Sequence, residues 1–354
     1  MDCFFAMDNV VCVNNNYFFI SLYNNWIYTL DSDLQIKKYI HVPFEYPHGC
    51  MEYGKIYVYQ NKLFVLPNYA QKIAVVDIDE NCISYIELDE LYGGIKYFMA
   101  VQREEFLYLI PCESKDILIV NMLTEVCEKV AIRVAKEAED KAIAWGNVIA
   151  EPDGFLLAKV YEKEFVRFHY DSKSIEYIKS SFDIEGGMSG ICKTSGGKWY
   201  VPKSANCIFF ESDEGVKCFN EFPKGYKAGD ISFYKIIPDR DRVFLLPRDA
   251  NMFLVITEEG KCINLKDINH TKNEGLDRYM FFSNLWRMGN DVYCIESASG
   301  KMYQITDDYC LVLKSFNVIN ERVEISFSEG IIVENPFHEC TLSNFIASLT
   351  KEDL

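Results

Sequence analysis

Short apolar runs bounded by polar turns alternate along most of the chain. Residues 62–79, KLFVLPNYAQKIAVVDID, hold one apolar run that ends at Pro67, a polar turn, and a second run that ends on Asp77. Residues 242–259, RVFLLPRDANMFLVITEE, repeat this pattern around Pro247. Apolar runs of about four to eight residues, separated by turn residues, are typical of β-strands. The pattern therefore predicts a chain of antiparallel hairpins.

The same pattern occurs seven times when the chain is aligned on Pro67 without gaps. Each copy has an apolar run before this anchor position, a small or polar residue shortly after it, and a second apolar run that a polar residue closes. The anchor positions are Ser21, Pro67, Pro111, Lys159 (which fits the pattern less well), Pro202, Pro247 and Glu296, spaced by 43–49 residues. In the second copy we expect four strands, at 50–58, 61–67, 72–78 and 82–88.

A repeat of about 40–50 residues made of short strands is typical of a β-propeller. One four-stranded sheet cannot bury both of its faces, so neighbouring copies must stack around an axis. The sequence therefore predicts an all-β fold, a seven-bladed β-propeller of four-stranded antiparallel blades. Proline lacks the N–H that a strand ladder needs, so at an anchor position it ends the strand.

The period and strand order resemble those of kelch-like and galactose-oxidase-type propellers over residues 9–318. The glycine doublet that closes the second strand of a kelch repeat is absent, because proline stands at that strand end. The histidine and tryptophan signature of the WD-type blade is also absent. The resemblance implies the fold and no functional residue.

The two ends of the chain extend beyond the repeats. We expect residues 1–335 to form the propeller, with one of the strand-like pieces 3–7 and 322–335 pairing with a terminal blade to close the ring. Residues 336–354 are expected to form a short helical extension. Thr341 is a suitable N-cap for it, and the apolar residues that follow have helical spacing.

Composition and charge narrow the function. The net charge of −17 argues against binding to nucleic acid phosphates. The N-terminus lacks the basic and apolar regions of a signal peptide, and no apolar run approaches the roughly 18 residues of a membrane span. We therefore expect a cytoplasmic protein with neither a nucleic acid nor a membrane partner; the sequence leaves its oligomeric state open.

Cysteine and histidine are not arranged as metal ligands. The chain has 13 cysteines but no C-x-x-C spacing, and its five histidines are scattered. Most of the cysteines lie in apolar runs, where a thiol packs as a small hydrophobic group. We expect free thiols, no metal site and no cofactor.

The strand order places the turns between second and third strands on one face of the propeller, together with the links between blades. We call this the top face; the other hairpins lie on the bottom face. Lys203 and Arg248 follow the anchor prolines of adjacent copies on the top face, and Arg278 lies in the next link. They could bind an anionic ligand or an acidic partner, or be ordinary solvated loop charges. Tyr69 and Trp145 could stack on a glycan, or pack between blades.

Two classes of function fit these features. The first is a non-catalytic propeller that binds a protein partner or a small anionic or glycan ligand on its top face. The alternative is an enzyme, a lyase or hydrolase, that acts on an anionic or carbohydrate substrate held by Lys203 and Arg248. His48, in a top-face link between Glu45 and Glu52, is its candidate acid or base. Fold alone cannot distinguish the two classes.

Overall fold

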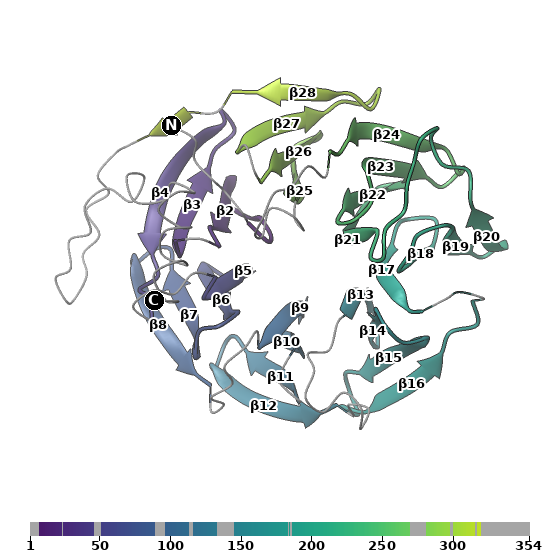
Figure 1. The fold of residues 1–354 in the computed structure, drawn as a ribbon. Helices are drawn as coiled ribbons and strands as arrows, with labels where there is room; N and C mark the ends of the chain where they lie inside the picture. The colour runs from purple at the N-terminus through teal and green to yellow at the C-terminus, as the bar shows by residue number, and fades with distance from the viewer. Residues whose placement is uncertain are drawn as a thin grey trace, which may run out of the picture.

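The structure is a computed structural model that describes residues 7–22, 24–45, 51–88, 96–112, 116–132, 145–182, 184, 186–269, 281–297, 300–315 and 317–319. Their strands form seven sheets arranged as blades in a ring (Figure 1). Within each blade, consecutive strands pair antiparallel, with the first strand innermost and the fourth outermost. The predicted seven-bladed propeller of four-stranded blades is confirmed.

The blades are numbered in chain order. Blade 1 contains β1 (Val11–Val13), β2 (Asn16–Ile20), β3 (Trp26–Leu30) and β4 (Gln35–His41); blade 2 contains β5 (Tyr53–Tyr59), β6 (Lys62–Pro67), β7 (Lys72–Asp77) and β8 (Cys82–Glu87); blade 3 contains β9 (Tyr97–Arg103), β10 (Phe106–Pro111), β11 (Asp116–Asn121) and β12 (Val126–Ala131); blade 4 contains β13 (Trp145–Glu151), β14 (Gly154–Lys159), β15 (Glu164–His169) and β16 (Ile175–Lys179).

The remaining three blades follow the same plan. Blade 5 contains β17 (Met188–Lys193), β18 (Lys198–Pro202), β19 (Ile208–Ser212) and β20 (Gly215–Phe219); blade 6 contains β21 (Phe233–Asp239), β22 (Arg242–Pro247), β23 (Met252–Thr257) and β24 (Cys262–Asp267); blade 7 contains β25 (Phe282–Met288), β26 (Asp291–Glu296), β27 (Lys301–Ile305) and β28 (Leu311–Lys314). In blades 2 to 7 the anchor position is the last residue of the second strand, as the alignment predicts.

A short strand after the seventh blade closes the ring. Strand β29 (Asn317–Ile319) pairs in parallel with the outermost strand of blade 1, where Val318 lies opposite Ile36. The chain that leaves blade 7 is thereby hydrogen-bonded to blade 1. Residues 317–319 therefore contribute a closing strand that the sequence did not single out. Residues 3–6, 322–335 and the predicted helical extension 336–354 lie outside the described residues.

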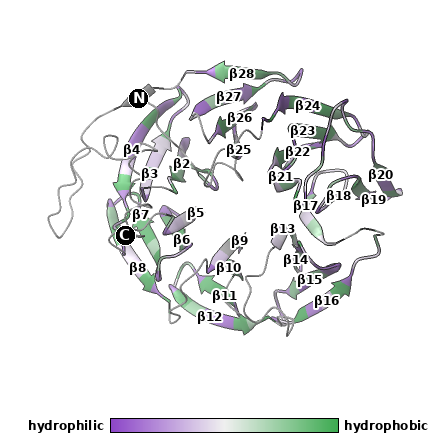
Figure 2. Ribbon diagram, in the orientation of Figure 1, coloured by the Kyte–Doolittle hydropathy of each residue, from purple (hydrophilic) through white to green (hydrophobic). Residues whose placement is uncertain are grey.

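The hydrophobic core lies between the blades. Seven clusters of buried residues occur in the described part, and each joins two neighbouring blades, including blades 7 and 1. Second and third strands such as β6 and β7 are covered on both faces, which explains their nearly continuous apolar sequences. The outermost strands are less completely covered and mix hydrophilic with hydrophobic residues, as Figure 2 shows for β4 and β24.

A β-bulge recurs at the top end of the innermost strand in blades 2 to 7. In blade 2 it lies between Tyr53 and Lys55, and in blade 6 between Phe233 and Lys235. Bulges bend a strand and redirect its side chains, and they are frequent next to functional sites. We call the residue just after each bulge, and its counterpart in blade 1, the axial position; these residues are Asn9, Lys55, Met99, Asn147, Gly190, Lys235 and Asn284.

The described residues were also compared with the expectations for cysteine pairing and for membrane spans. Ten cysteines lie among them, and all ten are free thiols. None of the described residues belongs to a helix with the length and hydropathy that a membrane crossing needs.

Candidate ligand-binding surface on the top face

Lys203 lies where three segments of the top face meet. Its Nζ is 2.7 Å from Asp230 Oδ1, in the link between blades 5 and 6, and 4.9 Å from the centre of the Tyr161 ring, in the β14–β15 turn of blade 4. The side chain of Lys203 is 19% exposed, whereas Tyr161 is 60% exposed. We call Tyr161, Lys203 and Asp230 the rim cluster. The lysine amine contacts both an aromatic ring and a carboxylate, and both contacts favour this position of the side chain.

Arg248 occupies the equivalent place in blade 6. The backbone N–H of Ser232 donates to the carbonyl of Lys203 (2.9 Å), and the N–H of Arg248 donates to the carbonyl of Ser232 (2.9 Å). The two cationic residues are thus neighbours on the top face, as the repeat predicts. The Arg248 Nε is 3.8 Å from Asp249 Oδ1, so this cation also lies beside a carboxylate.

The link between blades 5 and 6 is held in place by Asn251. The backbone N–H of Lys227 donates to Asn251 Oδ1 (2.7 Å), and Asn251 Nδ2 donates to the carbonyl of Gly225 (3.0 Å). In addition, the N–H of Ile231 donates to Asp249 Oδ2 (2.9 Å). These hydrogen bonds fix the backbone on both sides of Asp230, so the rim cluster is built on a constrained loop.

The charges of this surface are mixed. Lys203 and Arg248 each lie beside a carboxylate, and Asp230 is itself 77% exposed. A simple anion would have to compete with these carboxylates. The expectation of an anion site at Lys203 and Arg248 therefore stays a prediction. The rim cluster presents the exposed ring of Tyr161, bordered by charges of both signs.

Two of the other sequence candidates, Trp145 and Tyr69, have structural contacts of their own. Trp145 is 4% exposed in the core between blades 3 and 4, where its Nε1 donates to the carbonyl of Pro111 (2.5 Å). Tyr69 is half-buried in the β6–β7 turn; its backbone N–H donates to the carbonyl of Glu52 (3.1 Å) and its own carbonyl accepts a hydrogen bond from Lys96 Nζ (3.0 Å). Arg278 and His48 lie outside the described residues.

The two glutamates that flank His48 in the sequence are hydrogen-bonded to each other. Glu52 is fully buried, and its Oε2 accepts the backbone N–H of Glu45 (2.9 Å) and Asn25 Nδ2 (3.2 Å). The Glu45 carboxylate accepts the Tyr53 hydroxyl (3.1 Å) and the N–H of Gln71 (2.6 Å). Burial, and then the negative charge of Glu45, raise the pKa of Tyr53. These contacts give both carboxylates a structural role in the first link.

His41 is a titratable residue packed among aromatic rings in the same region. Its ring lies 5.1 Å from that of Trp26 and 5.4 Å from that of Phe44. Burial lowers the pKa of His41 from its ordinary value of 6.5 to about 4, although a hydrogen bond from the imidazole to the backbone of Asn24 partly opposes this. The folded protein therefore holds His41 neutral at a pH where the unfolded chain protonates it.

We expect acid to destabilise the protein through His41. As the pH falls from 6.5 towards 4, only the unfolded chain binds this proton, so the free energy of unfolding should fall by about 1–3 kcal/mol. The measurement is urea unfolding at several pH values for the wild type and His41→Gln. The variant should lose less stability across this interval. Identical slopes for the two proteins would assign the acid sensitivity to other groups.

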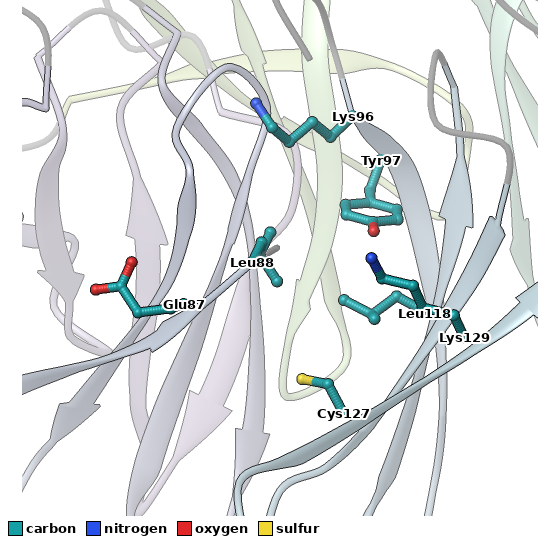
Figure 3. Close-up of a pocket in the computed structure, with 7 residues that line it drawn as sticks. All are labelled: Glu87, Leu88, Lys96, Tyr97, Leu118, Cys127 and Lys129. Carbon is teal, nitrogen blue, oxygen red and sulfur yellow. The ribbon is translucent and has the colours of Figure 1, made fainter. Parts of the chain in front are cut away.

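A small cavity lies between blades 2 and 3 (Figure 3). Its volume is about 20 Å³, which is room for roughly one water molecule. It is lined by Glu87, Leu88, Lys96, Tyr97, Leu118, Cys127 and Lys129. In Figure 3 the amine of Lys129 points toward the hydroxyl of Tyr97. A cavity of this size cannot hold an organic substrate.

Sequence reasoning missed a charged group near the axis. Lys55 and Lys235, in blades 2 and 6, both contact the carboxylate of Asp8, which precedes β1. The signal that could have revealed them is their shared axial position in two copies of the repeat. In the described part of the chain, no group of three or more His, Cys, Asp or Glu is arranged to hold a metal ion.

Comparison with protein-family models and with curated proteins finds no match. Solved structures with a similar fold include a streptogramin B lyase (13% identical, TM-score 0.63, covering 88% of this chain and 94% of that chain) and the virginiamycin B lyase of Staphylococcus aureus (12% identical, TM-score 0.61, 83% and 92%). Another is YCF48 bound to a D1 peptide (10% identical, TM-score 0.56, 86% and 94%). At these identities the likeness establishes the fold alone.

Proposed function

We propose that this protein is a non-catalytic propeller that binds a segment of a partner protein on its top face, at the rim cluster. The observation that carries this proposal is the Tyr161 ring, which is 60% exposed while the Lys203 amine lies over it. Tyrosine is enriched among residues that dominate protein interfaces, because it buries a large area and can also form a hydrogen bond.

The surroundings of the ring support a protein partner over a simple anion. Asp230 and Asp249 balance the charges of Lys203 and Arg248, so the surface offers ion-pairing groups of both signs. Such a polar border around an aromatic residue is the usual anatomy of a protein interface. YCF48, with a similar fold, was solved with a bound peptide, which makes a peptide ligand a reasonable first choice for this chain. The lyases share the fold as well, and the fold by itself favours neither function.

The test uses a displayed library of random peptides selected on the immobilised wild-type protein. We expect the enriched peptides to lose about tenfold or more in affinity for Tyr161→Ala, since truncation of a central interface aromatic has effects of this size. Lys203→Met should also weaken binding, because the amine no longer holds the ring and Asp230 in place. Affinities would be measured by calorimetry with individual synthetic peptides.

The matched control is Leu123→Ser, which removes another exposed apolar side chain. Leu123 is 59% exposed in the β11–β12 hairpin on the bottom face, so its loss should leave peptide affinity unchanged. Peptides that bind Tyr161→Ala and Lys203→Met as tightly as the wild type would contradict the proposal. So would peptides that respond only to Leu123→Ser.

A further inference from the structure

Two lysines from distant blades converge on one carboxylate. Lys55 Nζ is 2.6 Å from Asp8 Oδ2, and Lys235 Nζ is 3.4 Å from Asp8 Oδ1 and also donates to the backbone carbonyl of Asp8. The lysines belong to β5 and β21, which lie on opposite sides of the ring interior in Figure 1. All three side chains are mostly buried, with exposures of 15% for Lys55, 21% for Lys235 and 22% for Asp8.

The repeat explains why the two lysines face the same point. Both occupy the axial position, just after the bulge of the innermost strand. At three of the other axial positions the residue is asparagine, and at Met99 and Gly190 the side chain is apolar or absent. None of these seven axial residues is acidic, so the ring of axial positions concentrates positive charge in an otherwise acidic protein.

The carboxylate comes from outside the strands. Asp8 belongs to the segment before β1, and the next residue, Asn9, anchors that segment to the edge of β5. Asn9 Nδ2 donates to the carbonyl of Ile56 (2.6 Å), and its Oδ1 accepts the N–H of Ile56 (2.9 Å). Met7 is buried in the core between blades 7 and 1. The segment therefore delivers Asp8 to the lysines without belonging to the sheet of blade 2.

We propose that Lys55 and Lys235 form a binding site for a small carboxylate, and that in this structure Asp8 occupies it as an intramolecular ligand. Two amines from opposite sides suit the two oxygens of one carboxylate. Because the side chains are mostly buried, the site suits a small molecule better than a macromolecule. This inference concerns the axis and is independent of the proposed function of the rim cluster.

The electrostatics of the group agree with this proposal. Burial lowers the pKa of Lys235 to about 8. The attraction of Asp8 opposes this shift, and the repulsion of Lys55 adds to it. Burial alone would raise the pKa of Asp8, but the two lysines outweigh it and hold the pKa below its ordinary value. Tyr57 on β5 and Tyr234 on β21 have raised pKa values because of burial, so both stay neutral near pH 8. A bound carboxylate would thus need Lys235 in its protonated form.

The experiment removes the carboxylate of Asp8 by substitution and supplies a small carboxylate, acetate or formate, in solution. Asp8→Gly lacks a CH₂COO⁻ group, so acetate is its probe; Asp8→Ala lacks only the carboxylate, so formate is its probe. We expect each probe to raise the melting temperature of its variant in a saturable manner. Acetate should bind Asp8→Gly at least about tenfold more tightly than it binds the wild type, in which the tethered Asp8 competes for the site. Affinity should be lower at pH 9 than at pH 6, because Lys235 loses its proton.

Three controls keep the result specific. Chloride at equal ionic strength should not reproduce the stabilisation, and adding Lys55→Met and Lys235→Met to Asp8→Gly should abolish it. Glu151→Ala removes a comparable carboxylate, which lies 2.5 Å from Lys198 Nζ and 3.4 Å from Arg167 Nε; these more exposed cations should give formate a smaller effect. Should one Asp8 variant fail to fold, the other variant with its own probe carries the same test.

Several outcomes would overturn the inference. Equal acetate affinity in Asp8→Gly and the wild type would show that Asp8 does not compete for the site. Stabilisation that persists without both lysines, or that is matched by Glu151→Ala with formate, would show that the axial position has no special affinity for carboxylates.

Discussion

Trp199→Ala should lower the free energy of unfolding by about 3–5 kcal/mol, the range for loss of a large buried aromatic side chain. Trp199 is completely buried in the cluster between blades 5 and 6, with the rings of Phe210 and Phe219 at 4.6 and 5.7 Å. Its Nε1 donates to Thr194 Oγ1 (3.0 Å), which in turn donates to Glu258 of blade 6 (2.6 Å). The substitution thus removes core volume and one member of a bridge between two blades.

The measurement for this core position is equilibrium unfolding in urea, with the slope of the transition compared between proteins. Leu123→Ala is the control, because Leu123 is 59% exposed and should change stability by no more than about 0.5 kcal/mol. Trp199→Phe should fall between the two, since it keeps an aromatic ring and loses the hydrogen bond. A loss below about 1 kcal/mol for Trp199→Ala would contradict the tight packing of blades 5 and 6.

Gly146→Ala should destabilise the protein by about 1–3 kcal/mol, because blade 5 leaves no room for a side chain there. A Cβ atom on Gly146 would come within 2.0 Å of the backbone carbonyl oxygen of Met188. Backbone atoms of β17 cannot move aside without disturbing their own strand pairing. Glycine at this position is therefore required by the close approach of blades 4 and 5.

The repeat supplies a matched control for this substitution. Gly54 is the bulge residue of blade 2, at the position that Gly146 occupies in blade 4. The three atoms nearest to a Cβ atom on Gly54 all belong to the side-chain amide of Asn68, the closest at 2.6 Å, and a side chain can shift more easily than backbone. Gly54→Ala should thus stay within about 1 kcal/mol of the wild type, helped by the lower entropy of its unfolded chain. Thermal unfolding of both variants tests the difference, and equal losses would refute the assigned contact with Met188.

The site could be predicted only in part. The spacing after Pro202 and Pro247 correctly placed Lys203 and Arg248 next to each other, because equivalent residues of adjacent blades have equivalent surroundings. It did not reveal that Lys203 contacts Tyr161 and Asp230, since these contacts depend on the course of a turn and a link that vary among the copies. For Trp145 the sequence left two readings, stacking on a glycan or packing between blades, and the structure shows the packing.

The sequence by itself determined the number of blades, the strands of each blade and the face on which each loop lies. These follow from local periodicity, because apolar runs and turn residues specify strands within one repeat. Only the tertiary structure decided that β29 closes the ring on β4 and that Asp8 lies between Lys55 and Lys235. Such contacts join residues far apart in the chain, and they form only when closure of the ring fixes the distance across its axis.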